Sequence, residues 1–144
     1  FPTRRSSDLF EINKACQAVL AKGLADMGVL TVSAEESLKP EVGLHRRWTL
    51  HGVSHHLGLD VHDCAQARKE QYLDAPLREG MVLTVEPGLY IQPDDELFAP
   101  EYRGIGIRIE DDVVVTADGC RNISENIPRH PDEIEKWMKG VLGR

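Results

Sequence analysis

Residues 103–119 read RGIGIRIEDDVVVTADG, and this stretch predicts strands of an antiparallel sheet. Its first part alternates isoleucine with glycine or charged residues, which is the pattern of a strand with one apolar and one polar face. The apolar face would bury the isoleucines, Ile105, Ile107 and Ile109. The opposite face would present Arg108 and Glu110 together. We therefore expect a charged pair on a strand whose other side belongs to the core.

Further strands are predicted on both sides of this one. Residues 113–116 run into Asp118-Gly119, a dipeptide typical of hairpin turns, and residues 121–124 would return as the paired strand. Upstream, residues 81–85 read MVLTV between a glycine and a proline, which indicates a short buried strand.

Helices are expected before and after these strands, which makes the chain an α+β protein. A helix is predicted over residues 10–28, with Gly28 as a left-handed cap. A short helix is expected between Thr31 and Pro40, and a terminal helix over residues 131–138. The apolar face of the first helix would consist of Ile12, Cys16, Val19, Leu20, Leu24 and Met27.

Residues 1–9, FPTRRSSDL, lack the apolar periodicity of the following sequence and are expected to be a non-native tail. They can be encoded by TTC CCT ACA CGA CGC TCT TCC GAT CT, which is the end of a widely used sequencing adapter. A natural disordered terminus is the alternative. Different codons in the underlying nucleotide sequence would exclude an adapter origin.

Composition excludes several classes of protein. With 144 residues, 41% hydrophobic and 28% charged, the chain has the size and balance of one soluble globular domain, and no membrane partner is expected. Its net charge of -7 and its scattered basic residues argue against a nucleic-acid partner. The cysteines, Cys16, Cys64 and Cys120, form no C-x-x-C motif, so we expect neither disulfides nor a zinc knuckle, and a cytoplasmic setting.

Histidines and carboxylates mark the region where chemistry is expected. Glu86 follows an apolar strand and Glu110 lies on the alternating one, where an unpaired buried charge would cost several kcal/mol. The segment 51–63, HGVSHHLGLDVHD, alternates histidines with Leu57, Leu59 and Val61, so we expect it to pass through the core and direct imidazoles into a cleft. An imidazole with two carboxylates suits manganese, zinc, cobalt or iron.

Three segments, HGVSHHLGLDVHD, GMVLTVEPGLYI and YRGIGIRIEDDVVVTADG, resemble successive C-terminal motifs of the aminopeptidase P branch of the M24 metallopeptidases. The resemblance extends from about His51 to Ser124. It implies the pita-bread fold of creatinases and aminopeptidases, here its C-terminal portion only, with a curved antiparallel sheet flanked by helices. Residues 10–144 would then be the C-terminal part of the catalytic domain.

The resemblance also implies a centre of two divalent metal ions, with Mn²⁺ expected before Co²⁺ or Zn²⁺. By motif position, the ligands supplied by this chain would be His55, Glu86 and Glu110. The family takes two further ligands from an earlier pair of aspartates. Upstream of His51 only Asp8 and Asp26 are present, and neither lies in a matching motif. We therefore expect the chain to lack two of the ligands and to be inactive alone.

Roles in substrate binding and catalysis follow from the resemblance in the same way. His62 resembles the residue that contacts the substrate and stabilises the intermediate. Glu86 would move a proton. His51 would form one wall of the pocket for the proline ring and is placed with the catalytic residues. Arg108 and Tyr90 would support the ligands and fix their geometry.

The implied activity is that of a metal-dependent Xaa-Pro aminopeptidase, which releases the first residue from peptides that have proline in second position. Prolidase, an Xaa-Pro dipeptidase, shares these motifs and stays an alternative. A non-catalytic pita-bread module that binds peptides or histones is another, and a structural domain with buried histidines is the least specific interpretation. Relatives of this kind form dimers or tetramers, so the complete protein can be a homo-oligomer.

Overall fold

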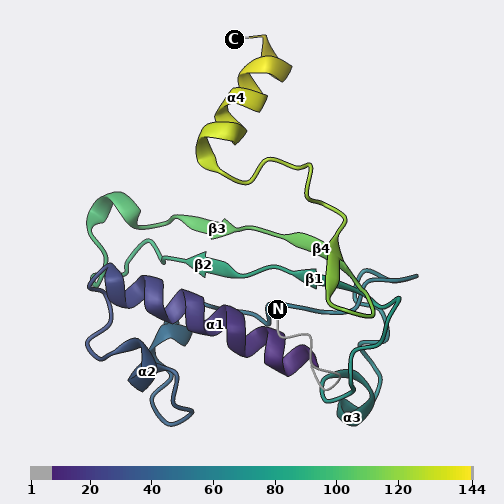
Figure 1. Cartoon of the computed structure of the whole chain (residues 1–144). Coiled ribbons are helices and arrows are strands. Elements are labelled where there is room, and N and C mark those ends of the chain that lie inside the picture. Colours follow the sequence, from purple (N-terminus) through teal and green to yellow (C-terminus); the bar gives the residue numbers. More distant parts are fainter. Residues whose placement is uncertain (1–7, 144) are drawn as a thin grey trace.

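Antiparallel strands form the centre of the structure, a computed structural model that describes residues 8–143 (Figure 1). Strands β1 (Val82–Val85), β4 (Asp111–Val115) and β5 (Cys120–Asn122) form a three-stranded sheet in the order β1-β4-β5. Strands β2 (Gly88–Tyr90) and β3 (Gly106–Arg108) form a two-stranded sheet. The expected strands and the hairpin between β4 and β5 are confirmed, whereas β2 was not predicted.

The two sheets are formed by consecutive parts of the same two stretches of chain. β2 follows β1 after two residues, and β4 follows β3 after two residues. β1 pairs with β4, and β2 pairs with β3, both in antiparallel orientation. Between these pairs, the backbone N–H of Ile109 donates to the carbonyl of Pro87 over 3.4 Å. The residues between the strands, including Glu86 and Glu110, therefore lie side by side.

Residues 53–57 run beside β1 on its other edge. The backbone N–H of Glu86 donates to the carbonyl of Val53 over 2.8 Å. The N–H of Thr84 donates to the carbonyl of His55 over 3.0 Å. These bonds make residues 51–63, the histidine segment, an irregular antiparallel neighbour of β1, and they bring His55 close to Glu86.

Helix α1 (Leu9–Asp26) begins one residue earlier and ends two residues earlier than predicted. Asp8 caps its start by accepting a hydrogen bond from the N–H of Glu11. Gly28 has a φ of 72° and donates to the carbonyl of Ala25, so the predicted left-handed cap is confirmed. Residues 1–7 of the expected tail lie outside the described residues, whereas Leu9 is buried in the core.

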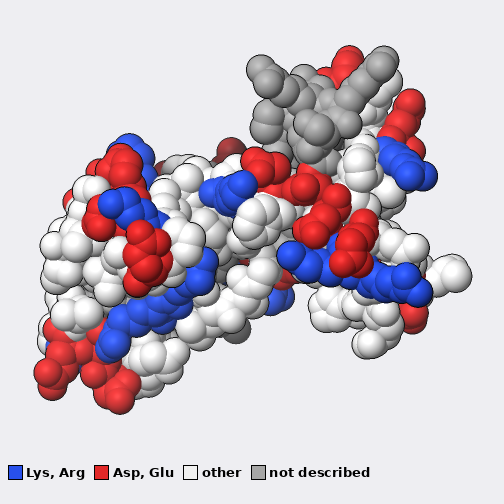
Figure 2. Space-filling view, turned by 90° about the horizontal axis from the view of Figure 1, so that it is seen from below, with Lys and Arg blue, Asp and Glu red and all other residues white. Residues whose placement is uncertain are grey.

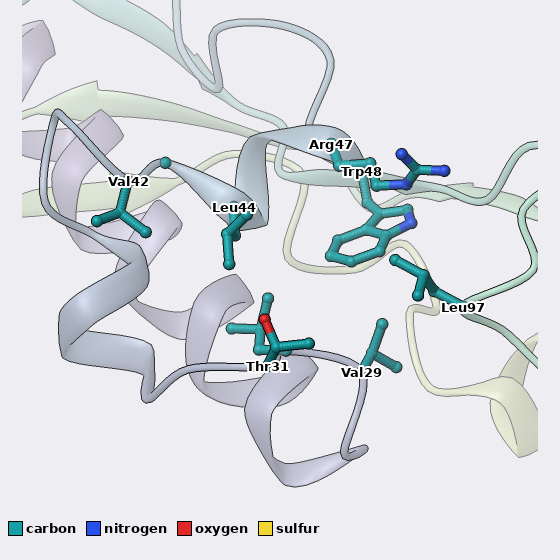
Figure 3. Close-up of a pocket in the computed structure, with 9 residues that line it drawn as sticks. Val29, Thr31, Val42, Leu44, Arg47, Trp48 and Leu97 are labelled. Carbon is teal, nitrogen blue, oxygen red and sulfur yellow. The ribbon is translucent and has the colours of Figure 1, made fainter.

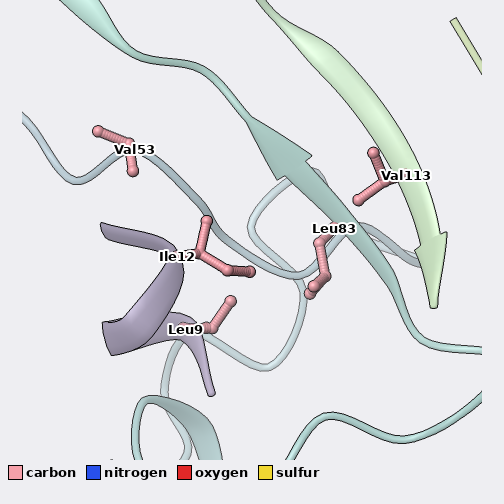
Figure 4. Packing of buried hydrophobic residues seen from close by; sticks show 5 residues of the cluster. All are labelled: Leu9, Ile12, Val53, Leu83 and Val113. Atoms are coloured by element: carbon pink, nitrogen blue, oxygen red, sulfur yellow. The ribbon is translucent and has the colours of Figure 1, made fainter. Parts of the chain in front are cut away.

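Two apolar clusters connect α1 to the strands. Leu9 and Ile12 of α1 pack against side chains of the histidine segment, β1 and β4, namely Val53, Leu83 and Val113 (Figure 4). At the other end of α1, the second cluster consists of Leu24, Trp48, Ile91 and Phe98. The predicted apolar face of α1 is partly wrong, because Val19 and Met27 are exposed. The buried residues of α1 are Leu9, Ile12, Ala21 and Leu24.

The remaining helices are short apart from the last. The expected short helix is α2, which is capped by Ser33 and ends before Pro40. Helix α4 is four residues longer than predicted, stands clear of the sheets in Figure 1 and has no buried side chain among its described residues. The bounds are α2 (Ala34–Ser37), η1 (Leu44–Arg47), α3 (Lys69–Tyr72), η2 (Pro100–Tyr102) and α4 (Pro131–Leu142).

Two expectations about burial are wrong. The isoleucines around β3 are 41 to 58% exposed, because β3 pairs only with β2 in the described part of the chain and α1 packs elsewhere. Leu59 and Val61 are also exposed, because the chain leaves β1 after Leu57 and turns at the surface. The histidine segment therefore enters the core only at Val53.

Acidic and basic side chains are interspersed on the face shown in Figure 2, with no continuous basic stripe across it. Both signs also occur together within single helices, as in the ion pairs Lys22–Asp26 in α1 and Lys139–Glu135 in α4. None of the helices described in residues 8–143 is long and apolar enough to cross a membrane.

Candidate metal and substrate site

His55 and Glu86 form the buried centre of the site. His55 lies on the segment beside β1, and Glu86 directly follows β1. The Nε2 atom of His55 is 3.1 Å from Oε1 of Glu86, and their side chains are only 15% and 10% exposed. The main-chain pairing described above holds this contact in place, so the structure brings together two of the three predicted metal ligands.

The second ring nitrogen of His55 determines how the imidazole faces Glu86. Nδ1 lies 3.0 Å from the carbonyl oxygen of His56, which can only accept a hydrogen bond. Nδ1 therefore carries the proton in the neutral ring, and the lone pair of Nε2 points at a carboxylate oxygen. Two acceptors at this distance are stable when a proton or a cation lies between them. A histidine that donates Nδ1–H to a backbone carbonyl is typical of metal ligands.

Thr84 contacts both His55 and Glu86, and the sequence did not predict this role. Its hydroxyl accepts a hydrogen bond from the backbone N–H of His55 over 3.1 Å and donates one to Oε1 of Glu86 over 3.2 Å. The side chain is 2% exposed. The available signal was its spacing: Thr84 precedes Glu86 by two residues and so shares a strand face with it.

Arg108 links the third predicted ligand to the centre. Its Nε atom is 3.6 Å from Oε2 of Glu86 and 3.7 Å from Oε2 of Glu110. The predicted Arg108–Glu110 pair on one strand face is thus confirmed, and the guanidinium also reduces repulsion between the two carboxylates. Arg108 and Glu110 are half-exposed, unlike Glu86.

The side chains of His55, Glu86 and Glu110 have the donor atoms that a divalent cation binds, but they do not form a complete coordination shell. An imidazole nitrogen and two carboxylates suit a transition-metal ion. Within residues 8–143, however, no three His, Cys, Asp or Glu side chains are grouped closely enough to hold a metal ion. Glu110 reaches the His55–Glu86 pair only through Arg108. A metal ion at this position would therefore need donors in addition to the described His55 and Glu86.

Of the other predicted site residues, His62 lies against His55, whereas His51 pairs with Tyr90. The ring of His62 is 4.4 Å from the ring of His55, centroid to centroid. Nε2 of His51 is 2.7 Å from the hydroxyl of Tyr90, and its Nδ1 is 2.7 Å from the carbonyl of Gly52. Nδ1 therefore donates to that carbonyl, and Nε2 accepts from Tyr90. Because both nitrogens of His51 are hydrogen-bonded, only the faces of its ring are available to contact a bound molecule.

Two glycines provide the space for Tyr90. An added Cβ at Gly88 would lie 2.6 Å from the Tyr90 ring, and one at Gly106 would lie 2.9 Å from it. Gly106 on β3 is the cross-strand partner of Tyr90, and Gly88 lies two residues before Tyr90 on β2. The strands therefore keep side chains away from the ring whose hydroxyl holds His51.

His56 points away from the centre and packs on α3. Its backbone N–H donates to the hydroxyl of Tyr72 over 3.2 Å, and the two rings meet edge to face with centroids 5.0 Å apart. Burial lowers the pKa of His56, although the nearby Asp63 partly opposes this effect. Tyr72 thus holds the histidine segment from the side opposite Glu86.

A separate buried carboxylate, Asp95, supports the segment that leads into the site. It accepts hydrogen bonds from Nε of Arg47 at 3.0 Å and from the indole N–H of Trp48 at 2.7 Å. The hydrogen bond from Arg47, with those from Trp48 and the backbone of Leu97, lowers the pKa of Asp95. The carbonyl of Trp48 accepts the N–H of Tyr90, which connects this cluster to the site.

A cavity of about 300 Å³ lies beside this cluster (Figure 3). Its wall is mostly apolar and includes Val29, Leu44, Trp48 and Leu97. None of His55, Glu86 or Glu110 lines it, so it is distinct from the candidate metal site.

The model of metallopeptidase family M24 matches residues 3–117. Xaa-Pro aminopeptidase 1 of Streptomyces coelicolor is 56% identical over 133 residues, which are 92% of this chain and 27% of that protein. Aminopeptidase P from E. coli, solved with the inhibitor Pro-Leu, is 39% identical with a TM-score of 0.84, covering 99% of this chain and 31% of that one. Its zinc-substituted form in complex with product is 40% identical, with a TM-score of 0.83 and the same coverage.

These proteins share the architecture described above, an antiparallel sheet with flanking helices, so the expected portion of the pita-bread fold is confirmed. The chain spans less than a third of the length of the relatives that it matches. Over that portion it is homologous to Xaa-Pro aminopeptidases, and the family model covers most of its residues. The chain belongs to the M24 family of metallopeptidases.

Proposed function

We propose that this chain is the C-terminal part of the catalytic domain of a metal-dependent Xaa-Pro aminopeptidase. Such an enzyme releases the first residue from peptides with proline in second position. The observation that carries the proposal is the His55–Glu86 contact, in which Nε2 of a buried imidazole lies 3.1 Å from a buried carboxylate oxygen. The identity with Xaa-Pro aminopeptidase 1 of Streptomyces coelicolor supports the substrate class.

In this proposal His55, Glu86 and Glu110 are three ligands of two divalent ions, and the missing ligands come from a part of the enzyme that this chain does not contain. The ions would supply Lewis-acid activation of water near neutral pH. Manganese is proposed first, with cobalt or zinc as alternatives; the zinc-substituted E. coli relative supports a divalent ion in general.

The chain's own residues would bind the peptide and move protons around it. Glu86, held by Thr84 and Arg108, would take the proton from the attacking water. His62 would donate a hydrogen bond to the developing oxyanion, an interaction that can lower the activation barrier by about 3 kcal/mol. The ring of His51, fixed by Tyr90, would form a wall against the proline ring.

Prolidase activity is the alternative, since it would use the same ligands on dipeptides that end in proline. A non-catalytic peptide- or histone-binding module is disfavoured, because His55, Glu86 and Glu110 are all present. We further propose a cytoplasmic setting, in line with three cysteines that are all unpaired. Assembly into a homo-oligomer is proposed for the complete enzyme only.

A chimeric enzyme tests the proposal. Residues 10–143 would replace the matching segment of Streptomyces coelicolor Xaa-Pro aminopeptidase 1, and release of the first residue from an Xaa-Pro peptide would be measured with Mn²⁺. Activity is expected in the chimera, and negligible activity in the 144-residue chain. Glu86→Gln should abolish it, whereas Glu101→Gln, at an exposed position of η2, should not.

Failure of a folded chimera to cleave the Xaa-Pro peptide would refute the proposed function. Cleavage of Xaa-Pro dipeptides alone would favour the prolidase alternative. Robust turnover by the isolated 144-residue chain would contradict the argument that two ligands are missing.

A further inference from the structure

The hydrogen bonding between His55 and β1 departs from a regular antiparallel ladder. The N–H of Thr84 donates to the carbonyl of His55, as a ladder requires. The return bond is different, because the N–H of His55 donates to the side-chain oxygen of Thr84 at 3.1 Å. Among the described residues, this hydroxyl is the only acceptor found for the His55 N–H. A side chain thus replaces a backbone carbonyl at the position of a proposed metal ligand.

The direction of the second bond follows from the first. A hydroxyl has one hydrogen, and the oxygen of Thr84 already accepts from His55, so its hydrogen is free to point at Oε1 of Glu86, 3.2 Å away. The same Oε1 atom faces Nε2 of His55. A closed ring therefore runs from the backbone of His55 through the Thr84 hydroxyl and the Glu86 carboxylate back to the His55 imidazole.

Water cannot easily replace the hydrogen bonds of this closed ring, because the groups that form it are buried. Thr84 is 2% exposed, and the Glu86 side chain is 10% exposed. A buried N–H that loses its acceptor retains its full desolvation cost, so removal of the hydroxyl would favour movement of the segment that carries His55. The other carboxylate oxygen, Oε2, lies on the side of Arg108. Thr84 therefore fixes which oxygen of Glu86 faces the imidazole.

We propose that Thr84 is a positioning residue that sets the separation and orientation of His55 and Glu86 through its hydroxyl, an inference that rests on the proposed function. Thr84 itself touches neither substrate nor metal in this role. The competing interpretation is that Thr84 is a β-branched residue chosen for packing in a strand. The two interpretations differ in Thr84→Val, which keeps the shape and removes the hydroxyl, and in Thr84→Ser, which keeps the hydroxyl.

Amide hydrogen exchange in the 144-residue chain tests the contact without metal or substrate. In the wild type the His55 amide should be protected. In Thr84→Val it should exchange about tenfold faster, as expected for one lost hydrogen bond. In Thr84→Ser it should stay near the wild-type rate. The amide of Ile123, which donates to the carbonyl of Asp112 beside the β4–β5 pair, is the internal control and should change little.

The chimera described above tests the consequence for the site. Thr84→Val should weaken Mn²⁺ binding, measured by calorimetry, by about 10- to 100-fold and lower kcat more than it raises KM. Thr84→Ser should have Mn²⁺ affinity and kcat close to those of the chimera with Thr84. Thr116→Val is the matched control, because it removes a hydroxyl that bonds Asp118 in the β4–β5 turn, and it should leave both unchanged.

Each outcome supports or overturns the proposal. An unprotected His55 amide in the wild type overturns it even if the valine variant fails to fold. A valine variant with wild-type exchange and Mn²⁺ affinity overturns it as well. If the chimera with Thr84 neither binds Mn²⁺ nor cleaves peptide, the proposed function fails, while the exchange data still decide whether the Thr84 hydroxyl holds His55.

Discussion

Replacement of Asp95 by asparagine should destabilise the chain markedly. Asp95 is 1% exposed and accepts three hydrogen bonds: two at Oδ2, from Arg47 and Trp48, and one at Oδ1, from the N–H of Leu97. Asparagine keeps one acceptor oxygen and places an NH₂ group against donors. At least one buried donor, such as the Trp48 indole, then loses its partner, which costs about 2 kcal/mol of unfolding free energy.

The assay is urea unfolding followed by tryptophan fluorescence, since Trp48 is buried and Trp137 is largely exposed. Asp94→Asn is the matched control: it is the exposed neighbour of Asp95, and its substitution should change the free energy of unfolding by no more than about 0.5 kcal/mol. Equal stability of the two variants at pH 7 would refute the reasoning.

The pH dependence of this difference has a definite sign. Because the pKa of Asp95 is lowered in the folded chain, the ionised carboxylate contributes stability above the unfolded pKa of about 3.9. That contribution is lost as the pH falls through the folded pKa. The stability gap between wild type and Asp95→Asn should therefore be constant near neutral pH and close only in strong acid. A gap that closes between pH 6 and pH 5 would assign the effect to another group.

Three further predictions concern the site and the backbone. Glu110→Gln in the chimera should lower activity by more than about 100-fold through loss of a ligand while the circular dichroism spectrum is unchanged; a smaller loss would remove Glu110 from the ligand set. Tyr90→Phe deletes the hydroxyl that is hydrogen-bonded to His51 and should raise KM for Xaa-Pro peptides about tenfold, with kcat less affected; an unchanged KM would contradict this. Gly28→Ala should reduce unfolding free energy by about 1 kcal/mol because φ is 72°, whereas Gly23→Ala, inside α1 with open space around it, should increase it by roughly 0.5 to 1 kcal/mol; equal signs in thermal unfolding would refute the backbone argument.

Local periodicity and turn chemistry were enough to predict most of the elements. The three- and four-residue spacing predicted α1, and the Asp118-Gly119 turn predicted the β4–β5 hairpin. The period of two in β3 placed Arg108 and Glu110 on one face, as observed. These features depend on neighbours within a few residues, so a single sequence contains the necessary information.

Burial and long-range contacts could not be predicted in the same way. The isoleucine pattern of β3 indicates an apolar face, but its burial depends on another element that covers it, and the described residues provide none. The His55–Glu86 contact depends on the register between the histidine segment and β1, which only the folded chain defines. Thr84 was missed because a threonine in a strand is ordinary, and its role becomes visible only when both partners are placed.

Helix α4 has a practical consequence for work with this chain. Its apolar residues, Ile134, Trp137, Met138 and Val141, recur at helical spacing along one side, yet none of its described side chains is buried. A solitary helix of 12 residues is marginal in water, so this segment should open locally far more often than the sheets do. Within residues 8–143, trypsin should therefore cut first after Lys136 or Lys139, and the shortened chain should keep the contacts between α1 and β1.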